Sequence, residues 1–282
     1  MLHSAKPLLI FSHGNSFPAS TYGLMLQHLR ARGYAVEAIE KFGHDPAYPV
    51  TNNWPHLVQE LADFAGHHAR LRLQPLFLVG HSLGGFLSTM CAALHPTLGG
   101  AVVQGVVLLD SPLIGGWKAN ALRIAKSAGL AERWGPGAVS RRRKIRWPSK
   151  EAAFMHFRSK KGFALWDNDA VRHYVEHGTF EHEGVRHLSF DRAIETSIYN
   201  TLPDHLQSLL AKHPLQCPLS FIGGKQSLEL KQAGLSLTER VTDGRMRRVA
   251  GTHLFPIENP LLTAAAIDAE VLNMAALNWD RI

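Results

Sequence analysis

The chain contains short runs of apolar residues, separated by segments in which apolar residues recur every three or four positions. The helical segments have recognisable ends, and the last begins with Asn259 at the N-cap and Pro260 at the first helical position. Strands that alternate with helices in this way predict an α/β fold with a parallel sheet and right-handed crossovers. The predicted strands are 7–12, 34–39, 76–81, 105–110, 218–223 and 246–251, and the helices between them include 20–32, 55–70 and 83–95.

The alternation is interrupted between residues 113 and 203, where strand-like runs disappear and aromatic, basic and helix-forming residues dominate. We interpret this stretch as a mainly helical insertion after the fourth strand. The expected organisation is therefore a core formed by residues 1–112 and 204–282, with residues 113–203 inserted as a helical cap.

The composition fits a folded protein, because 45% of the 282 residues are apolar. The longest apolar runs are far shorter than the roughly 20 residues needed to cross a bilayer, so no membrane span is predicted. The first residues lead directly into a strand-like run, which argues against a signal peptide. The two cysteines, Cys91 and Cys217, indicate no disulfide framework. A cytoplasmic location is expected.

The net charge of +7 comes from one segment, because residues 113–161 contain thirteen Lys and Arg against two acidic residues. Nucleic acid is not expected as a partner, since no recognised binding motif accompanies the charge. The favoured interpretation is that the aromatic residues of this segment pack inside or line a pocket while the cations are solvated. An anionic substrate or acyl carrier attracted to the segment is the alternative. The aromatic residues are Phe154, Phe157, Phe163 and Trp166.

The sequence Gly80-His81-Ser82-Leu83-Gly84 lies directly between a predicted strand and a predicted helix. This is the context of a nucleophile elbow, in which glycines permit a sharp turn that exposes the serine hydroxyl. The alternative is the glycine-rich turn of a nucleotide-binding fold, but no Gly-x-Gly-x-x-Gly follows an early strand. Ser82 is therefore the candidate nucleophile.

A serine nucleophile needs donors for the oxyanion and a base. The backbone N–H of Asn15, in the loop after the first strand, is expected to serve with that of Leu83 as the oxyanion hole. His253 follows the last strand, so it is expected at the same sheet edge as Ser82 and is the candidate base.

These motifs, His13-Gly14-Asn15, Gly80 to Gly85 and Gly251-Thr252-His253, resemble the α/β-hydrolase superfamily in identity and order. The resemblance covers nearly the whole chain outside the cap. Members of the family commonly have an antiparallel strand pair before the first of these motifs. Here only a few residues precede it, so we expect a reduced, wholly parallel sheet of six strands.

The acid of the triad departs from the family pattern. The usual place, after the strand that leads out of the cap, contains Gln226 and Ser227. Asp110 ends the preceding strand, and a branch resembling the haloalkane dehalogenases has its acid there. Asp110 is therefore the favoured acid; Glu229, or a dyad without an acid, is the alternative. Dehalogenases attack with aspartate, so the serine here favours acyl transfer instead.

The function expected is hydrolysis of carboxylic esters or related acyl compounds by a serine hydrolase, with no cofactor and no metal. A carbon–carbon bond hydrolase with the same triad, and a ligand-binding protein that retains the fold with little turnover, are the alternatives. His173 and His177 have the spacing of metal ligands, but a serine mechanism needs no metal. Glu195 and Tyr199 are expected to be an i, i+4 surface pair, or else to reach the pocket.

Overall fold

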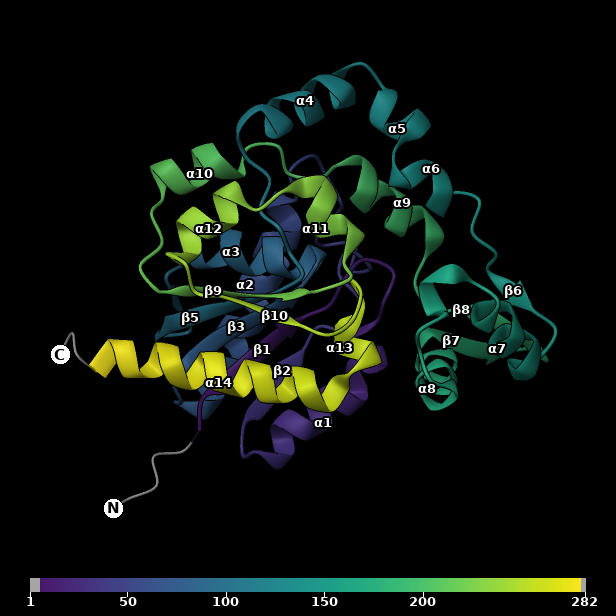
Figure 1. Cartoon of the computed structure of the whole chain (residues 1–282), viewed down its shortest axis with the longest axis horizontal. Helices are drawn as coiled ribbons and strands as arrows, with labels where there is room; N and C mark the ends of the chain where they lie inside the picture. The colour runs from purple at the N-terminus through teal and green to yellow at the C-terminus, as the bar shows by residue number, and fades with distance from the viewer. Residues whose placement is uncertain (1–5, 280–282) are drawn as a thin grey trace.

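The computed structural model describes residues 6–279, and its centre is a parallel β-sheet (Figure 1). The strand order is β10-β9-β5-β3-β1-β2, and every neighbouring pair in this order is parallel. This confirms the α/β prediction and all six predicted strands to within a few residues. The strands are β1 (Leu8–Ser12), β2 (Ala35–Ala38), β3 (Leu76–His81), β5 (Ala101–Leu109), β9 (Leu219–Gly224) and β10 (Met246–Val249).

The prediction of a wholly parallel sheet of six strands is wrong in one respect, because a short seventh strand joins the sheet beside β5. The two-residue strand β4 (Thr97–Leu98) pairs with the beginning of β5 in the antiparallel direction. Gly99 and Gly100 form the connection with φ angles of 57° and 88°. Because glycine adopts such angles without steric cost, the chain can reverse within two residues.

Helices cover both faces of the sheet (Figure 1). In β1, Leu8 and Ile10 belong to one buried apolar cluster, whereas Leu9 and Phe11 belong to the other. This alternation buries both faces of the strand, as a doubly covered sheet requires. The helices are α1 (Gly23–Ala31), preceded by the 3-10 turn η1 (Ala19–Tyr22), α2 (Pro55–Arg72), α3 (Leu83–Leu94), α10 (Leu206–Lys212), α11 (Leu228–Ala233), α12 (Ser236–Thr242), α13 (Phe255–Glu258) and α14 (Pro260–Trp279).

Between β5 and α10 the chain forms a segment that we name the α4–α9 segment, residues 116–200. Its first three helices arch over the sheet, the elements from β6 to β8 form a lobe beside it, and α9 packs on α6 (Figure 1). The elements are α4 (Gly116–Ser127), α5 (Leu130–Trp134), α6 (Pro136–Ser140), β6 (Arg146–Trp147), α7 (Lys150–Arg158), η2 (Lys161–Phe163), α8 (Asn168–Gly178), β7 (Thr179–His182), β8 (Val185–Leu188) and α9 (Arg192–Asn200).

This segment is mainly helical, as expected, but it also contains a three-stranded antiparallel sheet, β6-β8-β7, that the sequence analysis missed. Glu183 and Gly184 connect β7 to β8 with positive φ angles of 51° and 75°. A two-residue turn of this kind matches the twist of a hairpin. The glycine between two short β-compatible runs was the signal available in the sequence.

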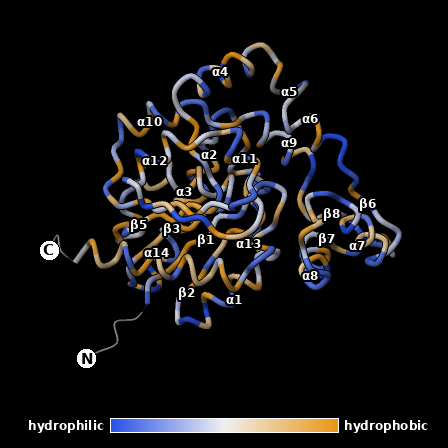
Figure 2. The backbone as a smooth tube through the Cα atoms, viewed as in Figure 1, coloured by the Kyte–Doolittle hydropathy of each residue, from blue (hydrophilic) through white to orange (hydrophobic). Residues whose placement is uncertain are grey.

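The lobe is joined to the sheet by a continuous apolar core. Phe157 and Tyr174 of the lobe belong to the same buried cluster as Phe11 of β1, and Phe17 packs on Tyr174 with ring centroids 5.5 Å apart. In Figure 2, hydrophobic residues (orange) lie both along the sheet and in the lobe. Phe154, Phe157, Phe163 and Trp166 are buried, as the sequence analysis expected. They are therefore not available as an exposed stacking surface for nucleic-acid bases.

Among residues 6–279, α14 contains the one helix window, Pro260–Leu277, that is long and apolar enough to cross a membrane by length and composition alone. A core helix of a globular domain has the same composition. Here Ile267, Val271 and Met274 are fully buried in the core cluster of one sheet face, and α14 packs on α1 and β5.

Candidate active site

The turn between β3 and α3 holds Ser82 in a strained backbone conformation, with φ 51° and ψ −114°. Glycines on both sides make this geometry possible. A Cβ at Gly80 would lie 2.1 Å from the Gly84 carbonyl oxygen, and a Cβ at Gly84 would lie 2.0 Å from the Ser12 carbonyl oxygen. Because both contacts are with backbone atoms, only glycine at position 80 allows the tight turn from β3 into α3, and only glycine at position 84 allows α3 to approach the end of β1 this closely.

The Ser82 hydroxyl does not cap α3, although Ser82 occupies the N-cap position. A capping serine normally has an extended backbone and accepts from the second or third N–H of the helix. The backbone strain at Ser82 prevents this arrangement, and such strain is typical of functional sites.

The loop after β1 is held by buried His13. Its Nε2 accepts from the Phe42 N–H at 2.9 Å, so Nδ1 carries the proton and donates to the Gly14 carbonyl at 2.8 Å. Burial lowers the pKa of His13 to about 4, which keeps the ring neutral. Among residues 6–279, neither the Asn15 N–H nor the Leu83 N–H is engaged in a hydrogen bond.

The depressed pKa of His13 predicts loss of stability in acid. Between pH 6.5 and about 4, His13 is protonated in the unfolded chain but neutral in the folded chain. Its contribution to the free energy of unfolding is therefore fully present above pH 6.5 and decreases as the pH falls below that value. The expected slope from this group is about 1.4 kcal/mol per pH unit. Urea unfolding at several pH values should show that His13→Asn reduces the slope by this amount. The exposed-site control His67→Gln should keep it, and an unchanged slope in His13→Asn would contradict the assignment.

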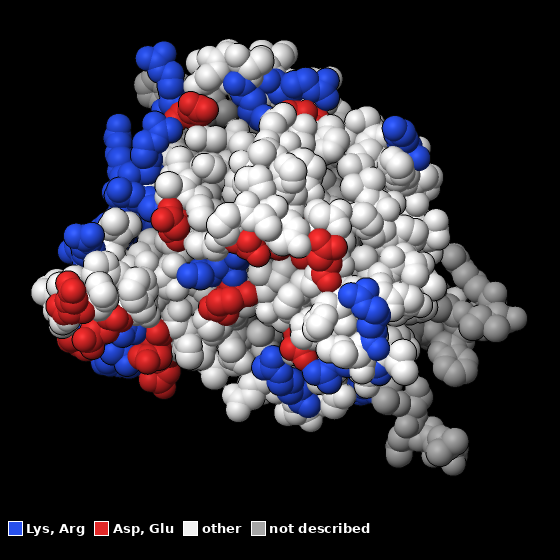
Figure 3. Space-filling model, turned by 180° about the vertical axis from the view of Figure 1, so that it is seen from behind, with Lys and Arg blue, Asp and Glu red and all other residues white. Residues whose placement is uncertain are grey.

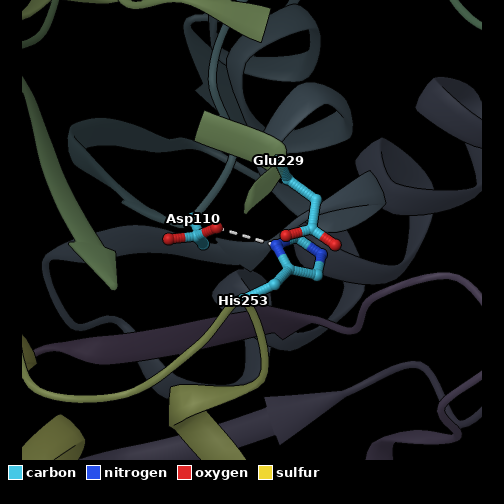
Figure 4. A group of neighbouring side chains, drawn as sticks. All are labelled: Asp110, Glu229 and His253. Carbon is cyan, nitrogen blue, oxygen red and sulfur yellow. Dashed lines mark hydrogen bonds and ion pairs between the residues drawn. The ribbon is translucent and has the colours of Figure 1, made fainter. Parts of the chain in front are cut away.

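Asp110 and His253 form a direct pair at the carboxyl edge of the sheet (Figure 4). His253 Nδ1 lies 2.8 Å from Asp110 Oδ2. Since a carboxylate only accepts, Nδ1 carries the proton and the lone pair lies on Nε2. The Gly224 N–H donates to Asp110 Oδ1 at 2.7 Å. Asp110 is fully buried, so these bonds replace its lost hydration.

Ser227 and Gln226, which occupy the usual place of the acid, support this pair instead. Ser227 Oγ donates to Asp110 Oδ2 at 2.6 Å. Gln226 Oε1 accepts from the Gly251 N–H at 2.7 Å, which anchors the loop that carries His253. A hydrogen-bond donor at 227 stabilises the carboxylate at Asp110, whereas a second carboxylate there would repel it.

Glu229, the alternative acid, is exposed and lies beside the pair. Asp110, Glu229 and His253 offer ligand atoms within 4.8 Å of one another, a spacing that could hold a metal ion. However, both Asp110 oxygens already accept hydrogen bonds from protein donors. Among residues 6–279, Glu229 makes a side-chain hydrogen bond with Ser227 at 3.3 Å and none with His253.

A second histidine, which was not predicted from the sequence, connects the parts of the site. His81 is fully buried, and its Nε2–H donates to the His253 carbonyl at 2.9 Å. Its Nδ1 therefore accepts from the Tyr22 hydroxyl at 2.7 Å, and Tyr22 in turn accepts from the Gly14 N–H at 3.1 Å. Burial holds the pKa of His81 well below its usual value. The only feature of the sequence that pointed to His81 was its position directly before Ser82 in the motif.

The structure brings Ser82 to the same edge as His253. The ring of His81, the residue before Ser82, lies 4.8 Å from the His253 ring between centroids. Ser111, the residue after Asp110, donates to the Ser82 carbonyl at 2.9 Å. Among residues 6–279, no hydrogen bond joins the side chains of Ser82 and His253. Such bonds are often long without substrate and shorten in the reacting complex.

Glu195 is not the surface residue that the favoured interpretation expected. It is buried and pairs with Arg143 at 3.0 Å, and its Oε1 accepts from Ser16 Oγ at 2.5 Å. Asn15 Nδ2 donates to the Glu195 carbonyl at 3.1 Å. Arg143 also donates to the Tyr174 hydroxyl at 2.7 Å. This network fixes the loop of Asn15 against α9. It was missed because its partners are far apart in the chain.

The parallel sheet, the strained turn at Ser82 and the buried pair beside it define a hydrolase of the α/β class. Residues 9–266 match the model of the alpha/beta hydrolase family, and the chain belongs to that family. This confirms the resemblance found in the sequence.

The solved structures that are similar share this fold at low identity. The crystal structure of E-2-(acetamidomethylene)succinate hydrolase has a TM-score of 0.68 and 22% identity, over 94% of this chain and 91% of that chain. The thioesterase domain from the curacin biosynthetic pathway has a TM-score of 0.68 and 20% identity, over the same shares. The peroxisomal alpha-beta-hydrolase Lpx1 from Saccharomyces cerevisiae has a TM-score of 0.69 and 15% identity, over 97% and 79%.

One curated relative matches part of the chain. Protein phosphatase methylesterase 1 of Candida albicans is 27% identical over 114 residues, which are 38% of this chain. The chain matches 30% of that relative's length.

Proposed function

We propose that the protein is a serine hydrolase of carboxylic esters or related acyl compounds, including thioesters. The observation that carries the proposal is the Asp110–His253 pair at 2.8 Å on the same sheet edge as a serine at φ 51°. The names of the similar proteins, a methylesterase and a thioesterase among them, support acyl transfer.

In this proposal, Ser82 Oγ attacks the acyl carbonyl and its proton passes to His253 Nε2. The backbone N–H groups of Asn15 and Leu83 bind the oxyanion, and Asp110 stabilises the imidazolium. The proton then goes to the leaving alcohol or thiol, which departs and leaves an acyl-serine. Water, deprotonated by His253, attacks this ester and releases the acid. No cofactor or metal takes part.

The remaining expectations fit the same proposal. The α4–α9 segment would act as a cap, since its Glu195 and Arg143 hold the loop that carries Asn15. Cys91 and Cys217 are free thiols, which supports a reducing, cytoplasmic location.

Labelling with a fluorophosphonate probe tests the proposal, because the probe reacts with an activated serine. We expect one adduct, mapped by peptide mass spectrometry to Ser82, and no adduct in Ser82→Ala. Ser88 is a built-in control, because it is fully buried on α3, six positions along the same helix. Folded protein that takes up no label at Ser82 would overturn the proposed function.

A panel of nitrophenyl esters then separates an esterase from a carbon–carbon bond hydrolase. An esterase releases nitrophenol with repeated turnover. A protein that is labelled but turns over no ester would favour the carbon–carbon alternative. A ligand-binding protein would show neither labelling nor turnover.

A further inference from the structure

A cavity of about 900 Å³ lies between the loop after β1 and the α4–α9 segment. Its wall includes Ser16 and Phe17, the two residues that follow Asn15, together with Glu195 and Tyr199 of α9. Ser82, Asp110 and His253 lie outside this wall. The cavity thus adjoins the active site at the loop assigned to the oxyanion.

One part of the wall is aromatic. Phe17, Phe157 and Phe163 line the cavity, and the rings of Phe157 and Phe163 pack with centroids 5.2 Å apart. Such a surface accepts the apolar body of a ligand, because burying apolar area there releases water from both surfaces. By itself it selects no particular acyl group.

The other part of the wall is cationic. Arg142, Lys144 and Lys160 line the cavity, and among residues 6–279 none of their side chains has a hydrogen-bond or ion-pair partner. Arg143 differs, because Glu195 neutralises it at 3.0 Å. Since Glu195 is the only acidic residue among the described residues of the wall, their lining has an excess of three positive charges.

The unpaired cations act on neighbouring groups. His156 also lines the cavity. Its pKa is lowered by burial and by the positive charges of Lys160, Lys144 and Arg143. Figure 3 shows that Lys and Arg gather along the edge of the molecule formed by the α4–α9 segment. Like charges held around a concave, partly apolar site focus the field and attract anions.

Tyr199 of α9 also belongs to the cavity wall. Burial raises the pKa of Tyr199 to about 12, and the charges of Glu195 and, to a smaller extent, Glu229 act in the same direction. Glu229 in turn lies within 4.8 Å of Asp110 and His253 by their ligand atoms. The cavity is linked to the proposed active site by the loop of Asn15, since the next two residues, Ser16 and Phe17, line its wall.

We propose that this cavity binds the anionic group of the substrate, so that the preferred substrates are acyl compounds that bear a carboxylate or a phosphate. This inference rests on the proposed function. Arg142, Lys144 and Lys160 contact the anion, and the aromatic wall contacts the apolar chain between the anion and the reacting carbonyl.

Two matched pairs of substrates test the proposal and distinguish the two anions. The carboxylate pair is the mono-nitrophenyl ester of adipic acid against nitrophenyl hexanoate. The phosphate pair is hexanoyl-coenzyme A against hexanoyl-N-acetylcysteamine. We expect kcat/KM to be about tenfold or more higher for the anionic member of at least one pair. That ratio should fall about tenfold in the variant combining Arg142→Gln, Lys144→Gln and Lys160→Gln, and it should fall with added salt in the unaltered protein.

The single variants Lys160→Gln and Lys161→Gln form a matched pair, since each removes one positive charge and Lys161, unlike its neighbour Lys160, lies outside the cavity wall. The ratio should fall in Lys160→Gln and stay unchanged in Lys161→Gln. A ratio near one in both pairs, or an equal fall in Lys161→Gln, would overturn the inference. Calorimetric titration with adipate and with coenzyme A measures anion binding without turnover. If no ester is hydrolysed, the proposed function fails, and the titration still decides whether the cavity binds anions.

Discussion

Replacing Asp110 with asparagine is expected to lower kcat for a nitrophenyl ester by about 10⁴-fold while the fold is retained. The Gly224 N–H donates to one oxygen of this side chain at 2.7 Å, so the amide oxygen of asparagine must take that place. The amide NH₂ then points at His253 and Ser227. It donates to Nδ1, which moves the histidine proton to Nε2, and a protonated Nε2 cannot accept the proton of Ser82.

Steady-state kinetics on Asp110→Asn, with thermal unfolding as a check of the fold, measures this effect. Glu229→Gln is the matched control, because it makes the same change in an exposed carboxylate beside the same histidine. It is expected to retain kcat within about tenfold. The reverse result, with a large loss in Glu229→Gln and near-normal turnover in Asp110→Asn, would assign the acid to Glu229.

Replacing Ser82 with alanine or with glycine is expected to lower kcat by about 10⁶-fold in both variants. The two variants should differ in stability. At φ 51°, alanine keeps the strain of the turn, whereas glycine relieves it. We expect the free energy of unfolding of Ser82→Gly to exceed that of Ser82→Ala by about 1 kcal/mol.

Urea unfolding of both variants measures this difference. The two free energies of unfolding do not depend on catalytic activity, which both variants lack. Ser88→Ala on the same helix is the control for the effect of any serine substitution on the stability of this region, since Ser88 is buried but has no strained backbone. Turnover within tenfold of normal in Ser82→Ala would exclude Ser82 as the nucleophile. Greater stability of the alanine variant would show that the turn is not strained in solution.

The surroundings of the Asp110–His253 pair accommodate the departure from the family pattern. The position after β9 that usually carries the acid contains Ser227, which donates to Asp110 at 2.6 Å. The carboxylate after β5 and the hydroxyl donor after β9 are thus complementary. Because the two strands are adjacent and parallel, an acid at either strand end can reach the same imidazole nitrogen.

Local patterns in the chain were sufficient for the strands, most helix ends and the turn at Ser82. Strand and helix periodicities, and the glycines on both sides of Ser82, act over a few residues, so they can be recognised without knowing the fold. The order of motifs along the chain was also sufficient to propose His253 as the base, because parallel strands end at one edge of the sheet.

Contacts between distant residues were decided only by the tertiary structure. The sequence left Asp110 and Glu229 as alternative acids, and the strand positions place His253 against Asp110. The buried network of Glu195 and Arg143, the link from Tyr22 through His81, and the three unpaired cations of the cavity likewise have no local signature. Their partners are brought together by packing of the α4–α9 segment on the sheet, and such long-range contacts leave no periodicity in the chain.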